Sequence, residues 1–275
     1  MNPVDRLFNA LPALPMMPKV VQEVIQSLKD DSVNFGTLAA KVAQDQVISA
    51  KVLRLANSSH FGASRQIRTI DDAISLIGLN SLRTLVIASG VTGAFASVPG
   101  LDLKKFWRHS LMTANVARQV CRQRKVESET AYTAGLMHAI GELLIHLAFP
   151  QAAGDAAAMC HGRSVPERKG VEHTLIGLDH CQAGAELARR WNFPEVIQNA
   201  IQHYAEPLHP DADDISRTIY VAAHISFGLE NEETAQHIAE SLNPDIAQAL
   251  NISPEAWVER IEDMRPLLAQ VEQSL

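Results

Sequence analysis

Histidine is the residue type whose number and placement in this chain could carry chemistry. There are 11 histidines among 275 residues, and His109, His138, His180 and His203 stand in segments of helical, largely apolar pattern. A neutral imidazole is a common ligand of zinc and iron(II), and a bound metal can convert water into a nucleophile. Taken singly, however, a histidine on an apolar helix face is more often a core residue hydrogen-bonded to the backbone.

The residues next to His138 decide how much chemistry that histidine can support. Ala139 follows it directly, and a methyl group cannot ligate a metal. Glu142 lies four residues after His138, which places both on one face of a continuous helix, where the carboxylate could reach a shared site. The alternative, which we favour, is that Glu142 is a solvated helix residue.

Other catalytic arrangements are absent or incomplete in the sequence. Gly-x-Gly-x-x-Gly and Walker loops do not occur, no serine stands in a Gly-x-Ser-x-Gly elbow, and Cys160 lacks an orienting context beside His161. The three cysteines are widely spaced and form no CxxC pair, which predicts no disulfide framework and a reducing, cytoplasmic location. We therefore expect neither a nucleophilic side chain nor another catalytic residue.

Charge and hydropathy exclude two classes of partner. The net charge of −7 and the sequence pI of about 5.9 provide no basic surface for phosphates, so nucleic acid is not an expected partner. No basic leader precedes an apolar segment, and the longest weakly polar run, residues 84–98, is shorter than the ~20 residues that a membrane span needs. The sequence predicts a soluble protein without a membrane partner.

The apolar pattern predicts an all-α fold. Hydrophobic residues make up 47% of the chain and aromatic residues 5%, and the Ala, Leu, Ile and Val positions recur at helical spacing rather than in strict alternation. Expected helices begin near Pro18 and after the capping residue Thr69, and Gly78 ends the second of these. Pro99 and Gly100 then close an N-terminal group of helices.

The histidines fall on the helices expected after Gly100. A long helix from Asp102 carries His109, and a second one, over residues 128–148, carries His138. A capping box at Asp179 starts the helix of His180, and a further helix runs from Pro194 to His203. Further helices are expected over 215–227, 232–242 and 254–273. We expect an N-terminal subdomain over 1–100, a second helical subdomain over 101–207 and a C-terminal extension over 208–275, with residues 208–214 as the linker or hinge.

Several stretches together resemble the HDOD family, a bacterial relative of the HD phosphohydrolases. The N-terminal likeness lies in residues 11–15, in Ala56-Asn57-Ser58 and in residues 70–78. The second likeness lies in residues 106–110, 134–138, 177–180 and 191–194. The family consists of all-helical signal-transduction or regulatory domains, so this resemblance implies an HDOD-type bundle with an HD-like second half.

The resemblance also implies a site and a defect in it. HD hydrolases hold one or two divalent metals with histidines and aspartates, and the matching histidines here are His109, His138, His180 and His203. Ala139 stands where the HD doublet has its aspartate, and His224 stands where a second aspartate is usual. Glu142 and His224 are further possible ligands. The related HD-GYP cyclic di-GMP phosphodiesterases have a second histidine where this chain has Tyr204, and the Gly-Tyr-Pro element is missing as well.

Three hypotheses follow from this resemblance. The leading one is a cytoplasmic regulatory domain with a degenerate metal site, which acts through an unknown signalling protein or a small ligand and is not an enzyme. The rival is a metal-dependent phosphohydrolase or phosphodiesterase that uses the histidine-rich site with one divalent ion, iron or zinc. In the third, the histidines never converge and the chain is a structural adaptor.

Overall fold

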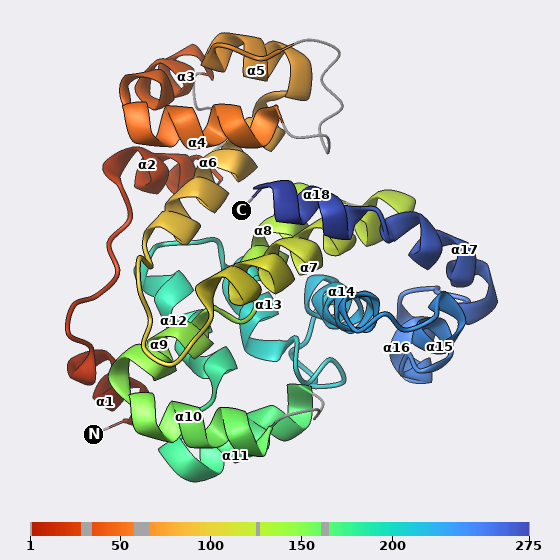
Figure 1. The fold of residues 1–275 in the computed structure, drawn as a ribbon. Helices are drawn as coiled ribbons and strands as arrows, with labels where there is room; N and C mark the ends of the chain where they lie inside the picture. The colour runs from red at the N-terminus through yellow and green to blue at the C-terminus, as the bar shows by residue number, and fades with distance from the viewer. Residues whose placement is uncertain (1, 29–34, 58–65, 125–126, 161–164, 275) are drawn as a thin grey trace.

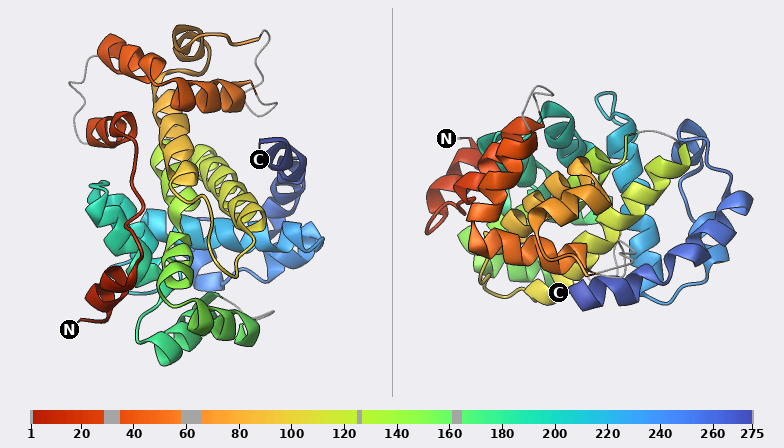
Figure 2. Two further views of the ribbon diagram at one scale, coloured as in Figure 1. Left: turned by 60° about the vertical axis from the view of Figure 1, so that its left-hand side comes forward. Right: turned by 90° about the horizontal axis from the view of Figure 1, so that it is seen from above.

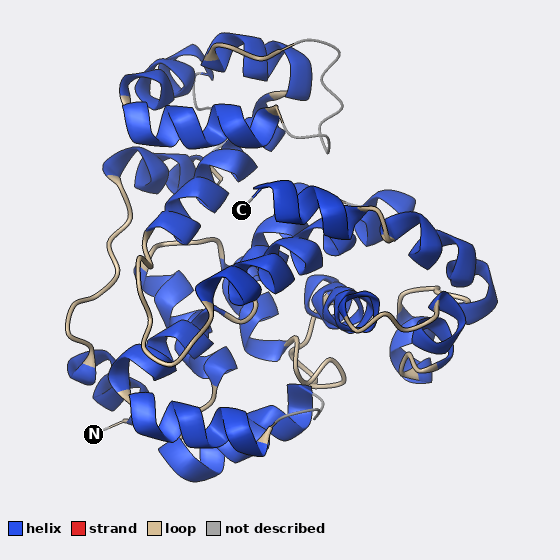
Figure 3. Cartoon of the chain, in the orientation of Figure 1, coloured by secondary structure: helices blue, strands red, loops and turns tan. Residues whose placement is uncertain are grey.

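The computed structural model describes residues 2–28, 35–57, 66–124, 127–160 and 165–274. Throughout these residues the regular structure is helical and contains no strand, which confirms the predicted all-α fold (Figure 3). In the same ranges no helix combines the length and the hydropathy that a membrane crossing requires.

The helices follow one another with short connections (Figure 1). In chain order they are α1 (Pro3–Ala10), α2 (Lys19–Ser27), α3 (Phe35–Gln44), α4 (Gln46–Ala56), α5 (Ile70–Ile77), α6 (Leu79–Gly93), α7 (Leu103–Arg124), α8 (Glu129–Met137), α9 (Ile140–Ala148), α10 (Pro150–Met159), α11 (Val165–Ile176), α12 (His180–Arg190), α13 (Glu195–His203), α14 (Asp214–Glu230), α15 (Ala235–Glu240), α16 (Pro244–Ala249), α17 (Pro254–Met264) and α18 (Leu267–Ser274).

The predicted helix boundaries that rest on local capping are confirmed. Helix α2 begins directly after Pro18. At the start of α5 the Thr69 hydroxyl accepts a hydrogen bond from the backbone N–H of Asp72 at 3.0 Å, and Gly78 ends the helix with a φ of 79°. The capping box of Asp179 and Gln182 is complete at the start of α12. These ends depend only on neighbouring residues, so the sequence is enough to locate them.

The predicted continuous helix over 128–148 is wrong, because the chain bends between α8 and α9. His138 ends α8, and Ala139, with φ −102° and ψ 9°, precedes α9. Close helix packing holds both sides of the bend. A side chain at Gly135 would come within 2.9 Å of Ala114 Cα in α7, and one at Gly141 would overlap the carbonyl oxygen of His180.

Helix α7 is the centre against which the site is assembled. It packs along α8 and α14, while α9 packs on α12 and α12 on α13. At the far end of α7 the buried Arg118 lies over the Tyr132 ring at 4.0 Å from its centroid and forms an ion pair with Glu129 at 3.3 Å. The ion pair and the ring contact compensate the buried charge of the guanidinium and join α7 to α8.

The remaining helices lie at two ends of this centre. Helices α3, α4 and α5 form a layer at one end in both Figure 1 and the left view of Figure 2. On the other side α14 leads to α15, α16 and α17, and α18 returns to pack on α7. The predicted helix over 254–273 is thus divided into α17 and α18, with Pro266 between them. The domain limits at residues 100 and 207 stay predictions.

Candidate histidine site

Three of the predicted histidines meet around one tyrosine in the core. The ring centroids of His109 and His138 lie 5.5 Å apart, and the Tyr204 ring lies 5.0 Å from His138 and 5.9 Å from His180. His109 comes from α7, His138 from the end of α8, His180 from the first turn of α12, and Tyr204 from the residue after α13. The site is therefore built where four helices converge.

His138 is held as a neutral imidazole. Its Nδ1 lies 2.7 Å from the carbonyl oxygen of Gly135, and because a carbonyl only accepts, Nδ1 carries the hydrogen. Burial, and then the neighbouring His109, lower the pKa of His138 to about 3. The remaining nitrogen, Nε2, therefore has its lone pair available to a ligand.

His109 is oriented by a carboxylate from α14. Its Nδ1 lies 2.7 Å from Oε2 of Glu230, whose side chain is only 11% exposed. Arg108 approaches the other oxygen of this carboxylate at 3.7 Å. A carboxylate that binds Nδ1 fixes the ring of a histidine and leaves Nε2 to face the site, as it does for many metal ligands.

His180 differs from the other two because both of its ring nitrogens have partners. Nδ1 lies 2.5 Å from Oε2 of Glu172, which also accepts the backbone N–H of His180 at 2.9 Å, and Nε2 lies 2.7 Å from the Tyr204 hydroxyl. Burial acts to lower the pKa of His180, but Cys181 and the Glu172 carboxylate outweigh it, so this pKa is raised well above its usual value. The ring is an imidazolium that donates through both nitrogens.

Glu172 takes its charge from the same arrangement. Burial alone would raise its pKa, whereas the contact with His180 and the Arg168 guanidinium lower it to about 2. Arg168 Nε lies 3.0 Å from Glu172 and its Nη2 lies 2.6 Å from Glu142. His180, Glu172, Arg168 and Glu142 therefore form an alternating chain of charges at the back of the site.

The interpretation of Glu142 as a solvated residue is wrong. Its side chain is 12% exposed and paired with Arg168. The supposed continuous helix face is also wrong, because the bend at Ala139 separates Glu142 from His138. Glu142 reaches the site region through the turn that starts α9, and its carboxylate is already neutralised by a guanidinium.

His203 and His224 do not join the other three histidines. His203, in the last turn of α13, stacks on His209 with ring centroids 4.6 Å apart and an interplanar angle of 19°. Burial, followed by His209, lowers the pKa of His203. His224 Nε2 instead lies 3.1 Å from both the carbonyl oxygen of Ile238 and the hydroxyl of Ser241. The metal-binding role predicted for all these residues stays a prediction.

Comparison with known proteins places this geometry in a family. Residues 14–207, more than half of the chain, match the HDOD domain. The chain belongs to the HDOD domain family. This agrees with the resemblance that the sequence motifs indicate.

Similar proteins include HDOD structures of matching length. A crystal structure from Shewanella amazonensis SB2B, named "Putative phosphohydrolase", has a TM-score of 0.82 and 29% identity, with 98% of each chain covered. An HDOD domain protein of unknown function from Geobacter sulfurreducens has a TM-score of 0.80 and 21% identity, covering 98% of this chain and 97% of the other. An uncharacterized protein of Treponema pallidum (strain Nichols) is 26% identical over 234 residues, which is 83% of this chain and 45% of that protein.

Four residues that orient or pair the side chains of this site are not predicted by the sequence. Glu172 and Arg168 lie on α11, Glu230 ends α14, and Tyr204 stands directly after a predicted ligand. Charged residues at helical spacing usually face solvent, and the pattern around Glu172 and Glu230 has no feature that distinguishes them. Only the Tyr204 position carried a signal, since the family resemblance implies a second histidine there.

Proposed function

We propose that this HDOD chain is a regulatory domain that binds a signalling protein or a small ligand and does not hydrolyse phosphoesters. The observation that carries the proposal is that both ring nitrogens of His180 are engaged, Nδ1 by Glu172 and Nε2 by Tyr204. The raised pKa of His180 favours the imidazolium, which has no lone pair, so Nε2 cannot ligate a metal unless the ring loses a proton and Nε2 gives up its contact with Tyr204.

The donors that remain are too few for the metal centre of the HD superfamily. His109 and His138 can each present Nε2, while Ala139 provides no carboxylate and Glu142 is paired with Arg168. A two-metal hydrolytic site needs ligands that hold both ions and compensate their charge. Two imidazoles do neither, so the residues present do not fit that centre.

The Tyr204 hydroxyl supports the same proposal through its position. It lies on His180 Nε2 at 2.7 Å, and Tyr204 is 2% exposed. A phenol that is buried against an imidazolium stabilises the folded core and keeps water and ions from that nitrogen. The preserved scaffold with a closed ligand position favours binding and regulation over catalysis.

Turnover in the presence of metals tests the proposal. Purified protein is incubated with Mn²⁺, Fe²⁺ or Mg²⁺ and with cyclic dinucleotides or nucleoside phosphates, in parallel with the His138→Ala variant. The expected result is the same product level as in metal-only blanks for both proteins. Enzyme-like turnover that His138→Ala abolishes would overturn the proposal.

The second candidate function is that of a metal-dependent phosphohydrolase with one ion, iron or zinc. The observation that favours it is the pair of His109 and His138, whose rings lie 5.5 Å apart with Nδ1 already engaged in each. Elemental analysis of protein purified without chelators tests this candidate. A stoichiometric ion that disappears in a His109→Ala variant supports it, and absence of that ion in the parent protein removes it.

A further inference from the structure

We propose that His203, His209 and Asp211 form a zinc-binding site at the end of α13, separate from the histidine site in the core. One ligand atom from each of the three residues lies within 4.8 Å of the other two. Among the described residues, this is the group of three or more histidine, cysteine or acidic side chains whose ligand atoms lie this close together. The proposed zinc site is independent of the regulatory function proposed for the chain.

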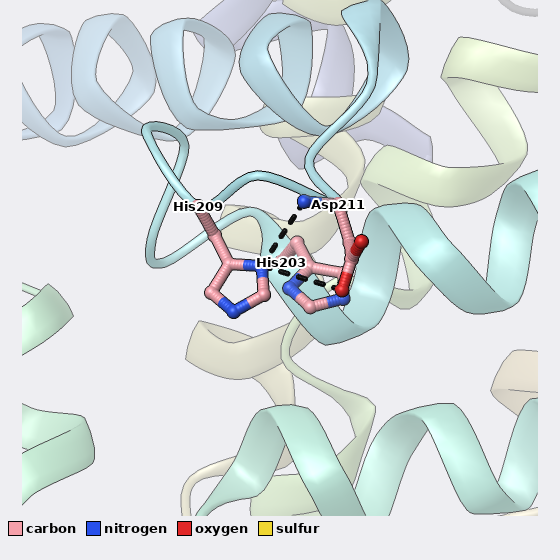
Figure 4. Close-up of side chains that lie close together, drawn as sticks. All are labelled: His203, His209 and Asp211. Carbon is pink, nitrogen blue, oxygen red and sulfur yellow. Dashed lines mark hydrogen bonds and ion pairs between the residues drawn. The ribbon is translucent and has the colours of Figure 1, made fainter.

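The three side chains lie close together, with the rings of His203 and His209 stacked and the Asp211 carboxylate beside them (Figure 4). His209 Nδ1 lies 3.2 Å from the backbone nitrogen of Asp211 and 3.7 Å from its Oδ2. Because an amide N–H donates in that contact, Nδ1 of His209 is the nitrogen with the lone pair, which accepts the hydrogen bond from the Asp211 amide. A zinc ion bound to this nitrogen would displace the hydrogen bond from the amide, and the Asp211 carboxylate lies close enough, at 3.7 Å, to share the ion.

His203 adds a polar atom that lacks a partner. Its Nδ1 is buried and has no hydrogen bond to the protein, although the ring stacks on His209. An unsatisfied buried nitrogen costs free energy, and an ion at this position is a direct way to satisfy it. This orphaned nitrogen is an observation independent of the spacing of the three residues.

The donor set suits zinc in particular. Two imidazole nitrogens and one carboxylate oxygen at about 2.0–2.2 Å leave a fourth tetrahedral position for water. In that geometry neighbouring ligand atoms lie about 3.4 Å apart, so closing from 4.8 Å requires shifts of little more than 1 Å, together with a rotation of the stacked rings that turns both lone pairs to the ion. His209 and Asp211 stand in the loop between α13 and α14, with side chains 40% and 77% exposed, and can make them.

A bound ion would add a second link between α13 and the loop before α14, beside the hydrogen bond from Asn199 to the carbonyl oxygen of Asp211 at 3.0 Å. His203 belongs to the last turn of α13, while Asp211 lies just before Asp213, which caps α14. The site would therefore fix the loop over 204–213 against α13. Tyr204, which contacts His180, is the first residue of that loop.

Zinc titration by calorimetry near neutral pH tests the site in the full chain. We expect one equivalent of Zn²⁺ to bind, and His209→Ala to weaken the affinity at least about 10–100-fold, since even a lost outer partner of a ligand costs that much. Asp211→Asn should weaken it as well. His237→Ala, which removes another exposed histidine, should leave the affinity unchanged.

Two further results keep the test decisive. The melting temperature should rise with Zn²⁺ in the parent protein and not in His209→Ala, because only a folded site gains from binding. Circular dichroism without zinc should be the same for both, since the replaced side chain is exposed. Absence of stoichiometric binding, or a Zn²⁺ affinity that His209→Ala leaves intact, would overturn the proposal. Loss of binding in His109→Ala would instead assign the ion to the core histidines.

Discussion

At the scale of single residues, the environment of each imidazole decides what it can do. His138 donates through Nδ1 to a carbonyl and stays neutral, whereas His180 lies between a carboxylate and a phenol and is charged. The same side chain therefore has a free lone pair in one position and none in the other. The hydroxyl of Tyr204 accepts from the charged ring, which makes it the residue that closes the site.

Removing that hydroxyl should cost stability. In Tyr204→Phe the Nε2–H of His180 loses its acceptor in a fully buried position, and the expected loss in the free energy of unfolding is about 1–3 kcal/mol. Urea denaturation followed by circular dichroism measures it. Tyr220→Phe is the matched control, because the half-buried Tyr220 has no hydrogen bond in the described chain, and its effect should stay within about 0.5 kcal/mol. Equal effects of the two substitutions would contradict the account of Tyr204.

At the scale of elements, the bend between α8 and α9 places His138 against the ring of Tyr204, whose hydroxyl contacts His180. The sequence predicts the capped helix starts at Thr69 and Asp179, since those depend on residues three positions apart. It does not predict the bend, because the hydrophobic pattern continues through it. The cause is tertiary, namely the close approach of α9 to α12 at Gly141 and Gly184, which no local propensity records.

A methyl group at this crossing should separate the two helices. In Gly141→Ala the new Cβ would overlap the His180 carbonyl oxygen and lie 2.7 Å from the Gly184 backbone nitrogen, neither of which belongs to a flexible side chain. We expect a loss of several kcal/mol or a failure to fold. The paired variant is Gly154→Ala in α10, where nothing lies within 4 Å of the new Cβ, and it should gain up to about 1 kcal/mol. A thermal melt of both proteins compares them, and a stable Gly141→Ala protein would show that the crossing is looser than described.

At the scale of the whole molecule, part of the site could be predicted and part could not. The motifs that resemble the HDOD family predict that His109, His138 and His180 lie together, and ring contacts through Tyr204 connect these three histidines in the structure. Glu172, Arg168 and Glu230 come from helices whose charged residues look ordinary in sequence, so their burial depends on the packing of the entire bundle. His203 was assigned to the core group and lies beside His209, because the turn after α13 directs Tyr204 inward instead.

The buried neutral His138 should make the whole fold sensitive to mild acid. Its pKa is about 3 in the folded protein and about 6.5 when unfolded, so the unfolded chain binds more protons between these values and stability falls as pH falls through this window. Glu172, whose pKa is about 2 when folded, loses its contribution only below about pH 4.5. His180, with a raised pKa, keeps its full contribution below about 6.5 and loses it at higher pH.

Comparison of pH 6 with pH 5 isolates the effect of His138. The parent protein should lose about 1 kcal/mol from this residue over that interval, measured by urea denaturation at each pH. His138→Gln should lack this loss, whatever its stability at pH 6, because glutamine does not titrate. His237→Gln, a change at an exposed position, should retain it. Identical pH dependence in the parent and in His138→Gln would mean that His138 is not held neutral.

The proposal that His180 is closed to metals depends on the charge of its ring, which ¹⁵N NMR of the imidazole side chains measures. With His180 assigned by comparison with a His180→Gln variant, both of its ring nitrogens should be protonated at neutral pH, and their shifts should not change on addition of Zn²⁺ or Mn²⁺. A neutral ring with an unprotonated Nε2 whose signal responds to one equivalent of metal would contradict the account.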